Sequence, residues 1–174
     1  MNILESWKSK IIFGYYCHPA FVEPEMPDAG FSVRLFANGA MLYQTYSLNI
    51  KSEPSIVQSD RVTLREGTMS RITRTLAGYA KEIDALPGYT DNGSNDGSFC
   101  DFVFCGKYVS SLNIRRADPA EVMQDNPEYY EKYCFDMADE STILDIFTRI
   151  TDAMKQEGVE LYLRHLIVEG KEIY

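Results

Sequence analysis

Alternating apolar and polar residues predict a β-hairpin near the start of the chain. Two alternating segments, 31–37 and 40–48, flank Asn38-Gly39. A type I′ turn favours this pair because both of its central residues need positive φ. A two-residue turn of this kind would pair Leu35 with Leu42 and place most apolar side chains on one face.

The remaining periodicity predicts further strands and helices. Asp118-Pro119 and Asn126-Pro127 are typical helix starts, since a capping side chain precedes a proline at the first helical position. The second of these helices is expected to run through about Cys134. Other helices are predicted over about 2–9, 68–84 and 140–157, and strands over 11–16, 53–66, 99–105, 108–115 and 159–168.

This order of elements predicts a single α+β domain spanning residues 1–174, with a mainly antiparallel β-sheet and helices packed on it. The chain shows no repeat and no linker. The run over 159–168 is apolar on both faces toward its end and is therefore predicted to be one interior strand, with His165 on its apolar side.

Charge is concentrated in one stretch of the chain. The protein carries a net charge of −9. Residues 117–145 hold nine acidic residues and one basic residue, Lys132, a local charge of −8. Such a balance repels nucleic acid and anionic membranes and attracts basic partners.

The sequence contains few candidate catalytic side chains, so we predict that the protein is not an enzyme. Its histidines are His18 and His165. Cys17 and His18 are neighbours whose side chains point to opposite faces of an extended strand, so they cannot act as a nucleophile–base pair. The alternative that remains is a small hydrolase that uses Cys17 or His165, and rapid thiol alkylation at neutral pH would reveal it.

No cofactor or metal ligand set is expected. The polar loop over 90–98 departs from the calcium-loop pattern, and no phosphate-binding glycine motif is present. The N-terminus lacks the features of a signal peptide, and no apolar run is long enough to span a membrane. We therefore expect a cytoplasmic protein with reduced thiols.

The acidic stretch is also rich in aromatic residues. It is either a solvated helical face or a surface that recognises a basic protein. Helical spacing predicts that Tyr130, Tyr133, Cys134 and Met137 face the core. The predicted partner-binding residues are Asp118, Glu121, Asp125, Glu128, Tyr129, Glu131, Phe135 and Asp136. A third reading is a DNA mimic that inhibits a DNA-binding protein.

The strand Ile11-Ile12-Phe13-Gly14 and the hairpin over 31–46, in a small acidic chain, resemble the immunity proteins of bacterial toxin systems. These proteins inhibit cognate toxins, commonly basic nucleases. The resemblance covers under a third of the chain, and no family site can be carried over to residues of this sequence. It implies a tight heterodimer with a toxin domain.

Overall fold

The computed structural model describes residues 10–19, 30–48, 54–91, 98–112, 114 and 118–174. The helix predicted over 2–9 lies outside these residues, as does most of the polar loop over 90–98. No helix in the described part of the chain is both long and apolar enough to cross a membrane.

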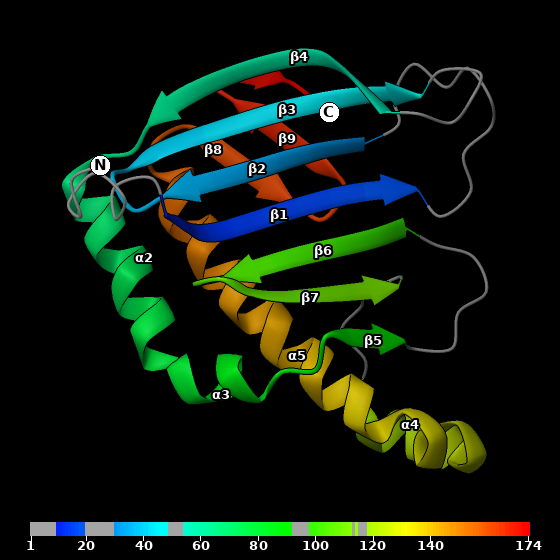
Figure 1. Cartoon of the computed structure of the whole chain (residues 1–174). Coiled ribbons are helices and arrows are strands. Elements are labelled where there is room, and N and C mark those ends of the chain that lie inside the picture. The colour runs from blue at the N-terminus through cyan, green and yellow to red at the C-terminus, as the bar shows by residue number, and fades with distance from the viewer. Residues whose placement is uncertain (1–9, 20–29, 49–53, 92–97, 113, 115–117) are drawn as a thin grey trace.

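A seven-stranded sheet forms the larger layer of the fold (Figure 1). Its strand order is β4-β3-β2-β1-β6-β7-β5, and all neighbours are antiparallel except β5 and β7. The strands are β1 (Ile11–Pro19), β2 (Gly30–Phe36), β3 (Ala40–Leu48), β4 (Pro54–Thr63), β5 (Tyr89–Asp91), β6 (Ser98–Phe104) and β7 (Lys107–Leu112).

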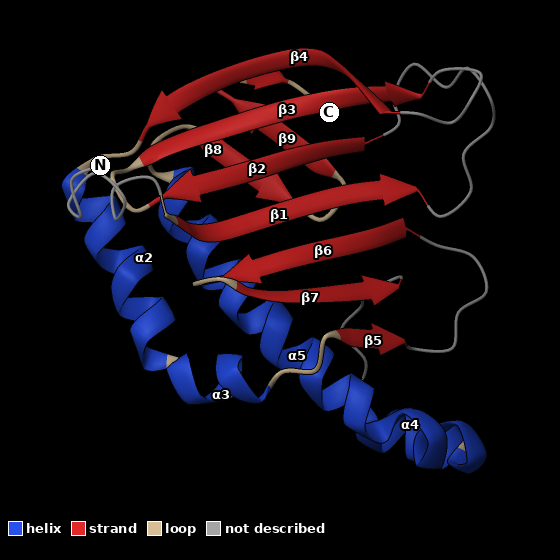
Figure 2. Cartoon of the chain, viewed as in Figure 1, coloured by secondary structure: helices blue, strands red, loops and turns tan. Residues whose placement is uncertain are grey.

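The helices and a second, three-stranded sheet lie together on one side of the large sheet (Figure 2). The helix α5 crosses behind the large sheet and leads into the small sheet. The bounds of these elements are α2 (Glu66–Gly78), α3 (Ala80–Ala85), α4 (Pro119–Asp125), α5 (Pro127–Lys155), β8 (Val159–Tyr162), β9 (His165–Val168) and β10 (Lys171–Glu172).

Aromatic side chains fill the space between the large sheet and α5. The ring of Tyr15 lies 5.7 Å from Phe31, 5.2 Å from Phe102 and 5.0 Å from Phe147, measured between ring centroids. Phe147 comes from α5 and the others from three adjacent strands. Such tilted aromatic contacts add to the stabilisation from apolar burial.

The predicted fold class is therefore confirmed: this is an α+β structure with a mainly antiparallel sheet and helices packed on it. Three predicted helices differ from those in the structure. The helix expected over 68–84 breaks at Tyr79 into α2 and α3, and the helices expected to end near Cys134 and to begin near 140 are one continuous helix, α5.

The hairpin of β2 and β3 is confirmed, but its predicted register is wrong by one residue. Leu35 lies opposite Met41 instead of Leu42. The connecting loop has three residues, 37–39. Within it, Gly39 has a φ of 85° and its N–H donates to the Phe36 carbonyl at 3.0 Å. This is the geometry of a type I turn followed by a left-handed glycine. The shift turns Met41 into the core.

The single strand predicted over 159–168 is wrong. The chain reverses at Leu163-Arg164, and the two halves pair as the antiparallel strands β8 and β9. Each half of this run buries one face against the same core. The two sets of apolar residues therefore resemble the two buried faces of a single interior strand. His165 consequently stands beside a turn and is exposed.

Candidate functional site

The helix α4 and the first turns of α5 extend past the edge strand β5 (Figure 1). The Asp118 carboxylate accepts a hydrogen bond from the Ala120 N–H at 2.9 Å and begins α4. The Asn126 side chain accepts one from the Tyr129 N–H at 3.1 Å and begins α5. Both predicted helix starts are thus confirmed. We call residues 118–136 the acidic arm.

The predicted partner-binding residues all lie on this arm. Glu128, Glu131 and Phe135 share one outward face of α5, since they follow the helical spacing i, i+3 and i+7. The α4 helix, which carries the other exposed carboxylates, packs against α5. Exposed members of the set are Asp118, Glu121, Asp125, Glu128, Glu131 and Phe135, and partly exposed members are Tyr129 and Asp136.

The prediction that four residues of this segment face the core is only partly right. Met137 is buried, whereas Tyr130, Tyr133 and Cys134 remain partly exposed. The arm lies past the edge of the sheet, so these side chains have less to pack against. Tyr133 instead packs on Tyr129, with ring centroids 4.6 Å apart.

Three large apolar side chains stand exposed on or beside the arm. Phe135 is 80% exposed, Met123 is 57% exposed and Tyr89 is 48% exposed. Burial raises the pKa of Tyr89, and the charges of Asp91 and Asp136 raise it further. Tyr89 and Met123 were not predicted from the sequence. Met123 belongs to a helix of only two turns without a buried residue.

Negative charge on the arm is only weakly compensated. Burial and the nearby Asp136 carboxylate raise the pKa of Asp139. Lys132 places its ammonium 4.8 Å from the centre of the Tyr133 ring. This contact holds the cation against its own helix. The arm therefore presents carboxylates around exposed apolar side chains.

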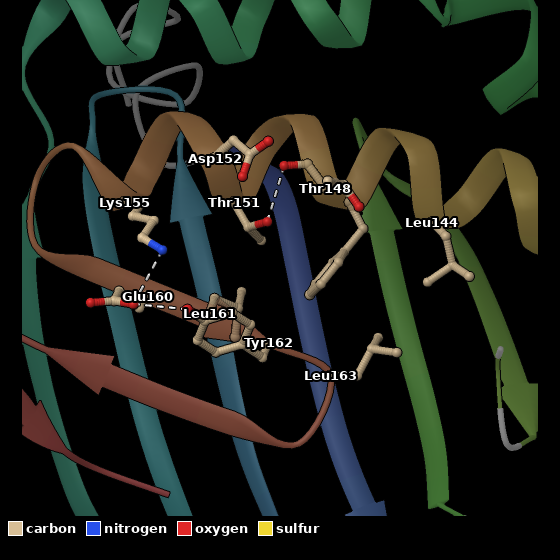
Figure 3. A pocket seen from close by; sticks show the side chains of 10 residues that line it. Leu144, Thr148, Thr151, Asp152, Lys155, Glu160, Leu161, Tyr162 and Leu163 are labelled. Atoms are coloured by element: carbon tan, nitrogen blue, oxygen red, sulfur yellow. Dashed lines mark hydrogen bonds and ion pairs between the residues drawn. The ribbon is translucent and has the colours of Figure 1, made fainter. Parts of the chain in front are cut away.

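A groove lies on another side of α5, between this helix and the β8–β9 hairpin (Figure 3). It has a volume of about 370 Å³. Leu144, Phe147 and Leu161 form its apolar wall. At one end Glu160 accepts a hydrogen bond from the Tyr162 hydroxyl at 2.8 Å and pairs with Lys155 at 3.6 Å. These polar groups satisfy one another.

The thiols and histidines are not arranged for nucleophilic catalysis. Cys17 is buried in the core, whereas His18 lies on the opposite face of β1 and pairs with Asp101 at 3.7 Å. His165 was predicted to be a core residue, and this is wrong. Its ring is exposed, with Nδ1 3.1 Å from the Tyr174 carbonyl oxygen and 3.3 Å from Glu172.

Cys17 lies directly opposite Cys100 across β1 and β6, and the two thiols form a buried pair. The Tyr15 hydroxyl oxygen lies 3.2 Å from the Cys100 sulfur. A hydrogen bond from Cys100 lowers the pKa of Cys17, while that bond and burial raise the pKa of Cys100. Because Cys17 is enclosed, its thiolate would have no path to a substrate in this arrangement.

No protein-family model and no curated protein matches this sequence. Within the described part of the chain, no three side chains of histidine, cysteine, aspartate or glutamate gather as a metal site would require. The acidic arm is the place where charge, exposed apolar area and predicted residues coincide, so it is the candidate site.

Proposed function

We propose that this protein is an immunity-type inhibitor. It binds a basic toxin domain, most simply a nuclease, through the acidic arm in the bacterial cytoplasm. The observation that carries the proposal is the position of Phe135, a fully outward aromatic side chain on the same helix face as Glu128 and Glu131.

The chemistry of this surface suits a protein partner. Binding hot spots are enriched in large side chains that enter a pocket of the partner and are ringed by groups that exclude water. Phe135 and Met123 supply such anchors. The surrounding carboxylates raise the association rate with a basic surface through long-range attraction. A partner with an apolar pocket rimmed by lysine and arginine would complement both features.

A capture experiment with three baits tests this function. The baits are the wild-type protein, the double variant Glu128→Lys/Glu131→Lys, and the matched control Glu66→Lys/Glu82→Lys. The control makes the same change of charge at exposed positions on α2 and α3, away from the arm. All three should unfold at similar temperatures.

We expect the wild type and the control, but not the arm variant, to capture a basic protein from a lysate of the source organism. The activity of that protein should then fall when the wild type is added at equal concentration. Capture that is equal with all three baits would contradict the proposal. Competition by duplex DNA for the captured partner would instead favour the DNA-mimic reading.

A further inference from the structure

The face of the large sheet that is turned away from α5 is covered by none of the described helices (Figure 2). Its side chains alternate with core residues along each strand. Beside the aliphatic Leu42 and Val103, the middle of this face carries mostly polar and aromatic residues: Tyr16 and His18 of β1, Ser32 and Arg34 of β2, Gln44 and Tyr46 of β3, Asp101 of β6, and Tyr108 and Ser110 of β7.

Arg34 is the central cation of this face, and it is incompletely satisfied. Its Nη2 donates a hydrogen bond to the Gln44 Oε1. Its Nε is enclosed and has no hydrogen-bond acceptor in the described part of the chain. A buried donor on a charged group that lacks an acceptor is unfavourable, and native structures rarely leave one without a reason.

Hydroxyl groups of the neighbouring side chains lie near Arg34 on the same face. Ser32 Oγ and Tyr46 OH lie 2.8 Å apart, and the Tyr46 hydroxyl donates to Gln44 Oε1 at 3.3 Å. Burial raises the pKa of Tyr16, Arg34 lowers it and Tyr46 raises it, so these three groups lie within electrostatic reach of one another. Arg34 is thus flanked by two tyrosines and a serine from three adjacent strands.

We propose that Arg34 is the centre of an oxyanion-binding site on the open face of the sheet. The site takes the carboxylate or phosphate group of a small molecule, with Tyr16 and Tyr46 as further donors. A guanidinium presents paired N–H groups that match the two oxygens of such an anion, and charge-assisted hydrogen bonds of this kind are the strong ones.

The charges on this face agree with an anionic ligand. The two arginines Arg34 and Arg61 lie on it together with Asp101, in a chain whose net charge is −9. The Asp101 carboxylate lies 3.7 Å from His18 Nε2, and against the opposing effect of burial, hydrogen bonding to Ser110 and Tyr108 lowers its pKa. The site lies on a different surface from the acidic arm and does not depend on the proposed function.

Calorimetric titration with inorganic phosphate and, separately, with acetate tests this site, at constant ionic strength in a chloride buffer. We expect saturable binding of at least one anion. Phosphate alone would assign a phosphate-bearing ligand, and acetate alone a carboxylate. Arg34→Lys keeps the charge but loses the planar fork, and should weaken binding by about tenfold or more.

Two further variants keep the test decisive. Tyr46→Phe retains the ring and removes one donor, so it should weaken binding several-fold even if Arg34→Lys fails to fold. Arg74→Met removes an exposed cation on α2, away from this face, and should change the affinity less than twofold. Absence of saturable binding by either anion, or equal binding by Tyr46→Phe and the wild type, would overturn the proposal.

Discussion

Phe135 and Met137 are two positions apart on α5, yet Phe135 is 80% exposed and Met137 is 4% exposed. Side chains two positions apart on a helix lie on nearly opposite faces. At this level α5 still packs on one side against the body of the protein, while its other side faces solvent. An aromatic residue here contributes little to folding, which leaves it available for binding.

Replacing Phe135 by alanine should therefore separate binding from stability. We expect the free energy of unfolding to change by no more than about 0.5 kcal/mol, since little surface is buried. Affinity for the partner should fall by about 2 kcal/mol, roughly 30-fold, as for a central anchor. Met137→Ala is the opposite control and should destabilise the fold by about 2–5 kcal/mol. Urea unfolding with titration calorimetry measures both quantities.

The Tyr15 hydroxyl joins the large sheet to the β8–β9 turn. It donates to the Leu163 carbonyl oxygen at 2.5 Å inside the core. Tyr15→Phe keeps the ring but leaves that carbonyl without this donor, so the free energy of unfolding should fall by about 1–3 kcal/mol. Tyr162→Phe, which removes a solvent-exposed hydrogen bond to Glu160, should change it far less. Equal effects of the two variants would contradict this role of Tyr15.

Asp139 gives the stability a defined dependence on pH. Burial and Asp136 raise its pKa in the folded state above the value of about 3.9 expected for the unfolded chain. Its charged form therefore destabilises the fold at neutral pH. We expect Asp139→Asn to be more stable than the wild type at pH 7.

The raised pKa of Asp139 also determines how the stability difference between Asp139→Asn and the wild type changes with pH. The stability gap should close as the pH falls through the folded-state pKa of Asp139 and should vanish below the unfolded value, where the wild-type side chain is neutral in both states. Thermal unfolding of both proteins between pH 3 and pH 7 follows the gap. A gap that widens toward low pH would refute this account of Asp139.

Thiol reactivity distinguishes the binding function from the hydrolase alternative. Cys105 is exposed and Cys134 is partly exposed, whereas Cys17 and Cys100 are buried. Iodoacetamide at neutral pH should label the first pair in the native protein and all four cysteines after denaturation. Intact mass with peptide mapping gives the order of labelling. Rapid modification of native Cys17, ahead of Cys105, would indicate an activated nucleophile.

Local chemistry explains what the sequence predicts well. A capping side chain followed by proline specifies a helix start through only a few consecutive residues, so the predicted starts of α4 and α5 are correct. The charge of the arm is likewise a property of consecutive residues. Helical spacing also identifies which side chains of the arm face outward, and Glu128 and Glu131 are exposed as expected.

Features that depend on distant partners are predicted less well. Asn38-Gly39 suits a two-residue turn in which both residues are left-handed, but only Gly39 of the pair is left-handed in the structure. The two strands of the hairpin also pair with β1 and β4, and these distant strands cannot be seen in the local sequence. Two-residue turns with both φ values positive occur at Cys105-Gly106 and Glu169-Gly170, where the sequence gives a weaker signal. The open face around Arg34 was missed because cross-strand neighbours cannot be read without the register.

The central claim is that the acidic arm captures a basic partner, and the association rate measured against salt concentration tests it most directly. Stopped-flow mixing would compare the wild type with Glu128→Lys/Glu131→Lys. We predict a wild-type rate that falls steeply as salt rises, and a variant that associates about tenfold more slowly at low salt with a flatter dependence. Identical rates and identical salt dependence for the two proteins would contradict the claim.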